Sequence, residues 1–160
     1  MSLAGSLRTG AIAVPLLVLA ISAWASGGGG GDAEPWPPKS AEFKKGVQAI
    51  NAKNYPDAIE WMTKAIAANP KDADAYNYLG YAHRKLGHFE DAVQFYSRAL
   101  ELNPDHRGAH EYLGEAYLEM NQPAEAKKHL AVLDKLCWLP CEQYDDLKKA
   151  IETYEKSHQG

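Results

Sequence analysis

This 160-residue sequence has few cysteines, no alternation of polar and apolar residues of the kind that predicts β-strands, and no run of basic residues. Two cysteines are too few for a small scaffold held together by several disulfides. The net charge is −4 and Lys and Arg form no run, so the sequence gives no support for nucleic-acid binding. No Gly-rich loop follows a strand pattern, and the ionisable residues form no recognisable catalytic arrangement. We therefore predict a protein that is not an enzyme and needs no cofactor.

Long hydrophobic runs are also limited. The longest, residues 10–25, has 16 residues, which is short of the roughly 20 that span a bilayer. Arg8 precedes it, and Ala23-Trp24-Ala25 ends it with a cleavage pattern, so we expect residues 1–25 to be a signal peptide. The mature protein is then exported, into a bacterial periplasm, with no membrane contact after cleavage. An uncleaved N-terminal anchor is the alternative. Glycine and proline dominate residues 26–38, which predicts a flexible linker.

The strongest pattern in the chain is a repeat with one fixed period. Gly46, Gly80 and Gly114 are equally spaced, and the same spacing separates Pro70 from Pro104. Each period holds two amphipathic helices and a short turn, which is typical of a stacked repeat array. The predicted helices cover about residues 40–52, 55–68, 73–86, 89–102, 108–120 and 123–136, followed by a last amphipathic helix over 141–154.

The middle period carries a specific set of packing residues, namely Tyr76, Leu79, Gly80, Ala92, Tyr96, Ala99 and Pro104. In these residues the chain resembles the tetratricopeptide repeat family. The resemblance implies an all-α fold, a helical-hairpin repeat array with units at 39–72, 73–106 and 107–140 and a capping helix at 141–157. We expect small residues such as Gly80 to lie where the two helices of a unit approach closely. Family members act by binding other proteins, so the resemblance implies a protein or peptide partner.

The first helix of each unit lines the concave face of such an array. We expect its polar centre, Tyr81 and Arg84, to be exposed, and Arg84→Ala to leave the fold intact. An extended peptide or a helix would suit this groove. The resulting hypothesis is an exported adaptor, serving as a scaffold or assembly factor. The predicted partner-binding residues are Phe43, Val47, Ile50, Asn77, Tyr81, Arg84, Glu111 and Glu115.

Some chaperone-docking family members hold two carboxylates with Lys, Asn and Arg side chains. At the matching positions this chain has Phe43, Val47, Tyr78, Gly108 and Tyr112. We therefore do not expect a chaperone C-terminus to bind by that mode. Self-association through the ends of the array is a further possibility.

Cys137 and Cys141 lie four residues apart, about 6 Å along a helix, within reach of a disulfide. In an exported protein we predict a structural bridge. The alternative function is a periplasmic thiol-redox or copper-handling accessory protein that acts through these cysteines, with His129 as a candidate third copper ligand. We expect the six histidines to form no cluster and to bind no metal. We also expect the acidic residues to lie on solvated faces, without a pocket that would raise a pKa.

Overall fold

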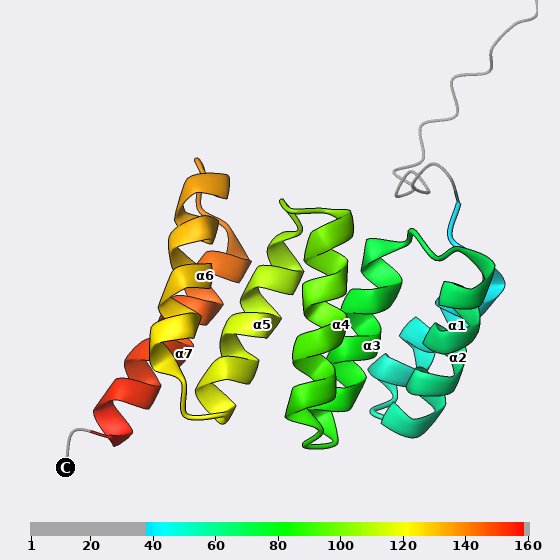
Figure 1. Ribbon diagram of the computed structural model, residues 1–160, viewed down its shortest axis with the longest axis horizontal. Helices are drawn as coiled ribbons and strands as arrows, with labels where there is room; N and C mark the ends of the chain where they lie inside the picture. Colours follow the sequence, from blue (N-terminus) through cyan, green and yellow to red (C-terminus); the bar gives the residue numbers. More distant parts are fainter. Residues whose placement is uncertain (1–37, 159–160) are drawn as a thin grey trace, which may run out of the picture. The chain divides into compact units, whose positions relative to one another are not determined.

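The computed structural model describes residues 38–158, and every regular element among them is an α-helix (Figure 1). Pairs of consecutive helices pack as three hairpins, α1–α2, α3–α4 and α5–α6, and the last helix packs against α5 and α6. The prediction of an all-α helical-hairpin array is therefore confirmed. The seven helices in this part of the chain are α1 (Ala41–Asn51), α2 (Tyr55–Ala68), α3 (Ala73–Lys85), α4 (Phe89–Leu102), α5 (Arg107–Glu119), α6 (Pro123–Leu136) and α7 (Glu142–Ser157).

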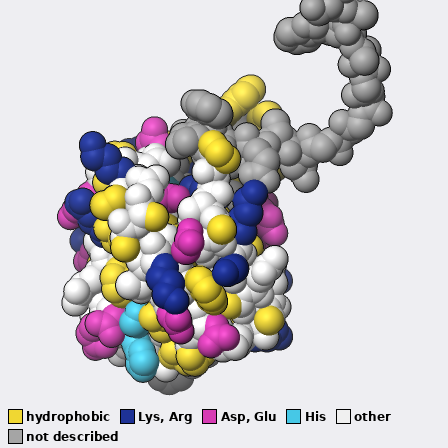
Figure 2. Space-filling view, turned by 90° about the vertical axis from the view of Figure 1, so that its right-hand side faces the viewer, with side chains coloured by type: hydrophobic (Ala, Val, Ile, Leu, Met, Phe, Trp, Pro, Cys, Tyr) yellow, Lys and Arg dark blue, Asp and Glu magenta, His cyan; other side chains and the backbone are white. Residues whose placement is uncertain are grey.

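The predicted signal peptide, and all of the predicted linker except Pro38, lie outside the described residues. Within residues 38–158, no helix combines the length and the apolar character needed to cross a membrane. At the end of the array formed by α1 and α2, charged side chains are interspersed among hydrophobic ones (Figure 2).

Short polar side chains cap α1, α2 and α3, and at the start of α2 Asn54 accepts a hydrogen bond from the backbone N–H of Asp57. The Ser40 hydroxyl accepts a hydrogen bond from the backbone N–H of Phe43 at 3.1 Å. The Asp72 carboxylate accepts from the backbone N–H groups of Asp74 and Ala75 at 3.1 and 3.3 Å. Because the first N–H groups of a helix have no partner within the helix, these caps determine where α1, α2 and α3 begin.

The turn inside each hairpin has one residue with a positive φ angle. These residues are Lys53, Gly87 and Asn121, with φ angles of 56°, 80° and 59°. Each lies one period after the one before it, so the three hairpins repeat the same turn. Only Gly87 adopts this conformation without a steric cost, since Lys and Asn carry a Cβ.

Glycine at the eighth position of each unit lets a neighbouring side chain approach the backbone closely. A Cβ on Gly80 would lie 2.8 Å from two ring carbons of Tyr96 and 3.2 Å from the carbonyl oxygen of Ala92. The predicted close approach of the two helices at Gly80 is thus confirmed. In the third unit, a Cβ on Gly114 would lie 2.6 Å from Leu147 of α7. The last helix therefore fills the space that a second-helix side chain fills in the central unit.

The hydrophobic core is divided into three clusters along the array. The first joins α1, α2 and α3, and the second joins α4 to α5. The third includes Leu147 and Ile151 of α7, which are 0% and 4% exposed. Helix α7 ends at Ser157, the last residue of the capping helix expected at 141–157, and its buried stripe closes the C-terminal side of the array.

Candidate peptide-binding groove

The first helices of the three hairpins form one face of the array, because α1 contacts α3 and α3 contacts α5. A hollow of about 700 Å³ opens on this face. Three of its lining residues, Phe43, Asn77 and Glu111, stand at the same position of successive units. Tyr78 and Tyr112 add aromatic rings to the lining. The stacking of the repeats therefore brings side chains of three units to one place.

The structure separates the eight predicted groove residues into sets. Phe43, Val47, Asn77 and Glu111 line the hollow just described. A second hollow of about 600 Å³ contains Arg84 and Glu115. The ring of Tyr81 lies 5.2 Å from that of Tyr112 and 5.6 Å from the Arg84 guanidinium, so Tyr81 contacts residues of both hollows. Ile50 is half-buried and lines neither hollow.

Two acceptor groups in the first hollow lack partners. Asn77 is 6% exposed, and its side-chain oxygen is buried without a hydrogen bond. Glu111 is 7% exposed, and its carboxyl group has no hydrogen-bond or ion-pair partner among residues 38–158. Burial, and then the nearby charges of Glu115 and Asp146, raise the pKa of Glu111 to about 8. The expectation that no pocket raises the pKa of an acidic residue was therefore wrong.

Arg84 is also buried, contrary to the sequence-based expectation. Its side chain is 4% exposed and lies between α3 and α5, where it forms ion pairs with Glu115 at 2.6 Å and Glu119 at 3.1 Å. Its acidic partners are less buried, with side-chain exposures of 24% for Glu115 and 40% for Glu119, so truncation of Arg84 removes buried packing and both ion pairs but leaves carboxylates that water can reach. We therefore expect Arg84→Ala to lower the stability of the fold, which makes Arg84 a poor choice as a groove mutant.

The α1 side of the hollow is held by an ion-pair network. His106 caps α5 by accepting the Ala109 N–H through Nδ1 at 3.2 Å, so its Nε2–H donates to Asp74 at 3.0 Å. The Lys39 ammonium lies 2.6 Å from Asp72 and 2.7 Å from Asp74. The hydrogen bond from His106, together with Lys39, keeps the pKa of Asp74 far below its usual value. Lys39 therefore lines the hollow as a neutralised cation.

The buried His110 and the half-buried His129 form a pair that the sequence did not predict. His110 donates through Nε2 to the Pro104 carbonyl at 2.9 Å, so its Nδ1 accepts from Nδ1 of His129 at 2.9 Å. Burial, and then the neighbouring His110, lower the pKa of His129 to about 4. Here His129 contacts another histidine, whereas the copper hypothesis placed it beside the cysteines.

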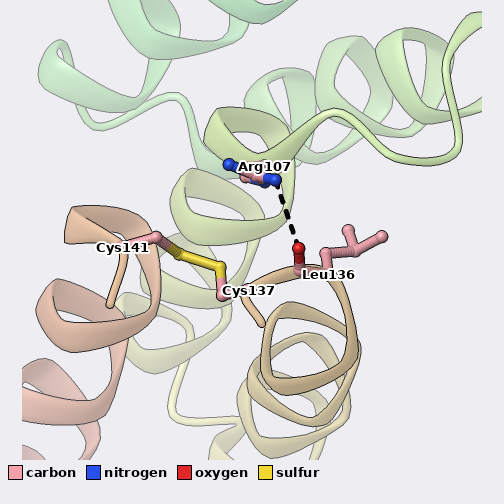
Figure 3. Close-up of a disulfide and its surroundings, with 4 residues drawn as sticks. All are labelled: Arg107, Leu136, Cys137 and Cys141. Carbon is pink, nitrogen blue, oxygen red and sulfur yellow. Dashed lines mark hydrogen bonds between the residues drawn. A yellow bond between two sulfur atoms is a disulfide. The ribbon is translucent and has the colours of Figure 1, made fainter. Parts of the chain in front are cut away.

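Cys137 and Cys141 form a disulfide with a Cα–Cα distance of 5.9 Å (Figure 3). The bridge connects the C-terminus of α6 to the N-terminus of α7, and Arg107 of α5 donates to the Leu136 carbonyl beside it at 3.2 Å. Neither cysteine is a free thiol in this structure. This arrangement ties the capping helix to α6, whereas binding of copper needs both thiols to be reduced.

Comparison with known families identifies two of the repeats. Tetratricopeptide repeat family models match residues 73–106 and residues 109–136. No curated protein sequence matches the chain.

Solved structures of similar fold cover about three quarters of the chain. The first TPR of Spaghetti (RPAP3), bound to the HSP90 peptide SRMEEVD, is 24% identical with a TM-score of 0.63 and covers 71% of this chain and 90% of its own. The TPR2B domain of yeast Sti1, in a complex with Hsp70, is 18% identical with a TM-score of 0.68, at coverages of 73% and 95%. The type III secretion translocator chaperone SycD of Yersinia enterocolitica is 15% identical with a TM-score of 0.66, at coverages of 74% and 92%.

Proposed function

We propose that this chain, which is a tetratricopeptide repeat protein, is a non-enzymatic adaptor that binds a basic segment of a partner protein in the hollow between α1, α3 and α5. The observation that carries the proposal is the buried side-chain oxygen of Asn77, which has no hydrogen bond, together with the Glu111 carboxyl group and the aromatic rings that line the same hollow. The solved relatives support peptide binding as the general role, since one of them holds an HSP90 peptide.

The chemistry of the hollow suits a Lys or Arg side chain. An ammonium or guanidinium group donates several hydrogen bonds, which would satisfy both Asn77 and Glu111. The rings of Tyr78 and Tyr112 line the same hollow and attract cations through their faces. A buried acceptor without a partner costs about 1–3 kcal/mol, so a cation that binds here removes an existing penalty.

The peptide bound by the Spaghetti domain is rich in Glu and Asp, but this hollow favours the opposite charge. The positions with which chaperone-docking relatives hold carboxylates contain Phe43, Val47, Tyr78, Gly108 and Tyr112, of which none carries a positive charge. Lys39, which also lines the hollow, is neutralised by Asp72 and Asp74. Glu111 would oppose an acidic peptide further at a pH above its raised pKa of about 8, where it is ionised.

Export to the periplasm and a scaffolding role there are part of the same proposal. The support comes from Arg8 and the hydrophobic run that ends at Ala25, and from the cysteine pair, since disulfides persist in oxidising compartments. Cell fractionation and N-terminal sequencing test this part. A mature chain that begins at Ser26 in the periplasmic fraction supports it, and full-length protein in the cytoplasm contradicts it.

The peptide proposal is tested with matched fluorescent peptides of identical sequence except for one central residue, which is Arg, Lys, Gln or Glu. Fluorescence polarisation above pH 8, where Glu111 is ionised, should detect binding of Arg and Lys peptides, and Glu111→Gln should weaken that binding at least about tenfold, as expected for the loss of a charged hydrogen bond. Glu152→Gln, which changes an exposed carboxylate on α7, is the matched control. Equal binding of the Glu and Arg peptides, or no effect of Glu111→Gln, would refute the proposal.

A further inference from the structure

A second cluster of polar side chains lies at the turn of the central hairpin, away from the hollow. His83 is in the last turn of α3, His88 is the residue just before α4, and Asp91 is in the first turn of α4. The nitrogen atoms of the two imidazoles and an oxygen of the carboxylate all lie within 4.8 Å of one another. The expectation that the histidines form no cluster was therefore wrong at this turn.

The positions of these groups suit a shared ion. Nδ1 of His83 lies 3.7 Å from an Asp91 carboxylate oxygen. Neighbouring ligands around a tetrahedral metal with bonds of about 2.0–2.1 Å are roughly 3.3 Å apart. His88 and Asp91 are exposed side chains, whereas His83 is half-buried, so an ion would have to draw the two exposed groups closer to His83. An arrangement of two imidazoles and one carboxylate is a common ligand set for first-row transition metals.

The state of His83 gives a second, independent observation. Its Nδ1 is buried and has no hydrogen-bond partner, because the Asp91 oxygen at 3.7 Å is too distant. The ring is held in place by Phe95, whose ring centre lies 5.0 Å away. His88 makes no side-chain capping bond to α4, so its imidazole is not occupied by a local role. The cluster thus has one fixed acceptor without a partner and two exposed groups that can close over an ion.

The matching positions of the other two units show which of the three residues is common to every repeat and which two occur in the central unit alone. The position of Asp91 is acidic in all three units, where it stabilises the N-terminus of a helix. The positions of the two histidines differ. His83 corresponds to Ala49 and Tyr117, and His88 corresponds to Asn54 and Gln122. Capping therefore explains the acidic residue, and packing against Phe95 accounts for an aromatic ring at His83, but neither explains a histidine at position 88, which makes no capping bond.

We propose that His83, His88 and Asp91 bind one divalent transition-metal ion of the zinc and copper class, with water completing the coordination. The ion would join the C-terminus of α3 to the N-terminus of α4 and stabilise the turn at Gly87. Because the site lies outside the peptide hollow, this proposal does not depend on the proposed function.

The test is a titration of the untagged chain, disulfide intact, with Zn²⁺ by calorimetry and by competition with a chromophoric chelator. The expected result is one ion per chain with micromolar or tighter affinity, and a thermal midpoint that rises with Zn²⁺ and returns after EDTA. His88→Ala and Asp91→Asn change exposed side chains, so the fold should persist, which circular dichroism verifies. Each should weaken binding at least about tenfold, in line with losing one metal ligand.

His158→Ala is the control, because it removes an exposed histidine of the C-terminal end. It should bind Zn²⁺ like the wild type. Absence of binding at 100-fold molar excess of Zn²⁺ would overturn the proposal. So would affinity that is unchanged in His88→Ala, or affinity that is lost in His129→Ala instead, since the ion would then bind at the pair of His110 and His129.

Discussion

Replacing Glu111 with Gln should change how the stability of this protein depends on pH. Burial, with the nearby carboxylates Glu115 and Asp146, raises the Glu111 pKa to about 8, whereas the same group titrates near 4.5 when the chain is unfolded. Between these pH values the folded state binds a proton that the unfolded state has released. The free energy of unfolding therefore falls as pH rises from about 4.5 to about 8, and the loss is complete above about 8.

The size of the effect follows from the shift. Each pKa unit corresponds to about 1.4 kcal/mol, so a shift from 4.5 to about 8 corresponds at most to about 5 kcal/mol. The hollow is open to solvent, which screens the charge, so we expect about 1–2 kcal/mol to be observed. Gln has nearly the same shape and does not titrate. Glu111→Gln should therefore be more stable than the wild type at pH 8 and close to it at pH 5.

The assay is urea unfolding followed by circular dichroism at several pH values between 5 and 9, with the disulfide intact. The quantity of interest is the difference between the two proteins, because the contribution of His129 and other groups cancels in it. Glu152→Gln, at an exposed position, should show no such difference. A difference that is flat with pH, or that has the opposite slope, would refute the burial argument for Glu111.

Three further substitutions test the packing of the array. Gly80→Leu should destabilise the fold by about 2–4 kcal/mol in urea unfolding, because the leucine side chain would overlap the Tyr96 ring. An unchanged unfolding midpoint would contradict the close approach of α3 and α4 at Gly80. Arg84→Ala should lower the free energy of unfolding by about 1–2 kcal/mol, since it removes a buried side chain and its two ion pairs, whereas the partly exposed Glu115 and Glu119 regain water. A stability equal to the wild type would show that the Arg84 side chain and its ion pairs contribute nothing. Replacing both Cys137 and Cys141 with Ser should lower the free energy of unfolding by about 2 kcal/mol, as expected for so short a closed loop. The helical circular dichroism should not change. A loss of helix would mean that the bridge supports more than the angle of α7.

Much of the fold could be predicted because its signals are local. Proline and short polar residues set the ends of helices within a turn or two of where they stand, so the predicted bounds of α2, α4 and α6 match the observed ones. The fixed period of the repeat then determines the architecture, because each hairpin packs only against its neighbours in the sequence. Gly80 could be assigned to a close approach for the same reason, as its contact is within one unit.

The chemistry of the groove depended on the tertiary structure. The sequence placed Glu111 and Arg84 on the right helices, but their burial results from side chains of other units and from α7, which no single period contains. The pairing of His110 with His129 and the contact of Leu147 with Gly114 also join separate helices.

The sequence by itself determined the helices, their order and the repeat, since these follow from short-range periodicity and capping. Only the tertiary structure decided which polar side chains lose their water. Desolvation depends on how all neighbouring units stack around a group, and this is why an ordinary glutamate became an acceptor with a raised pKa.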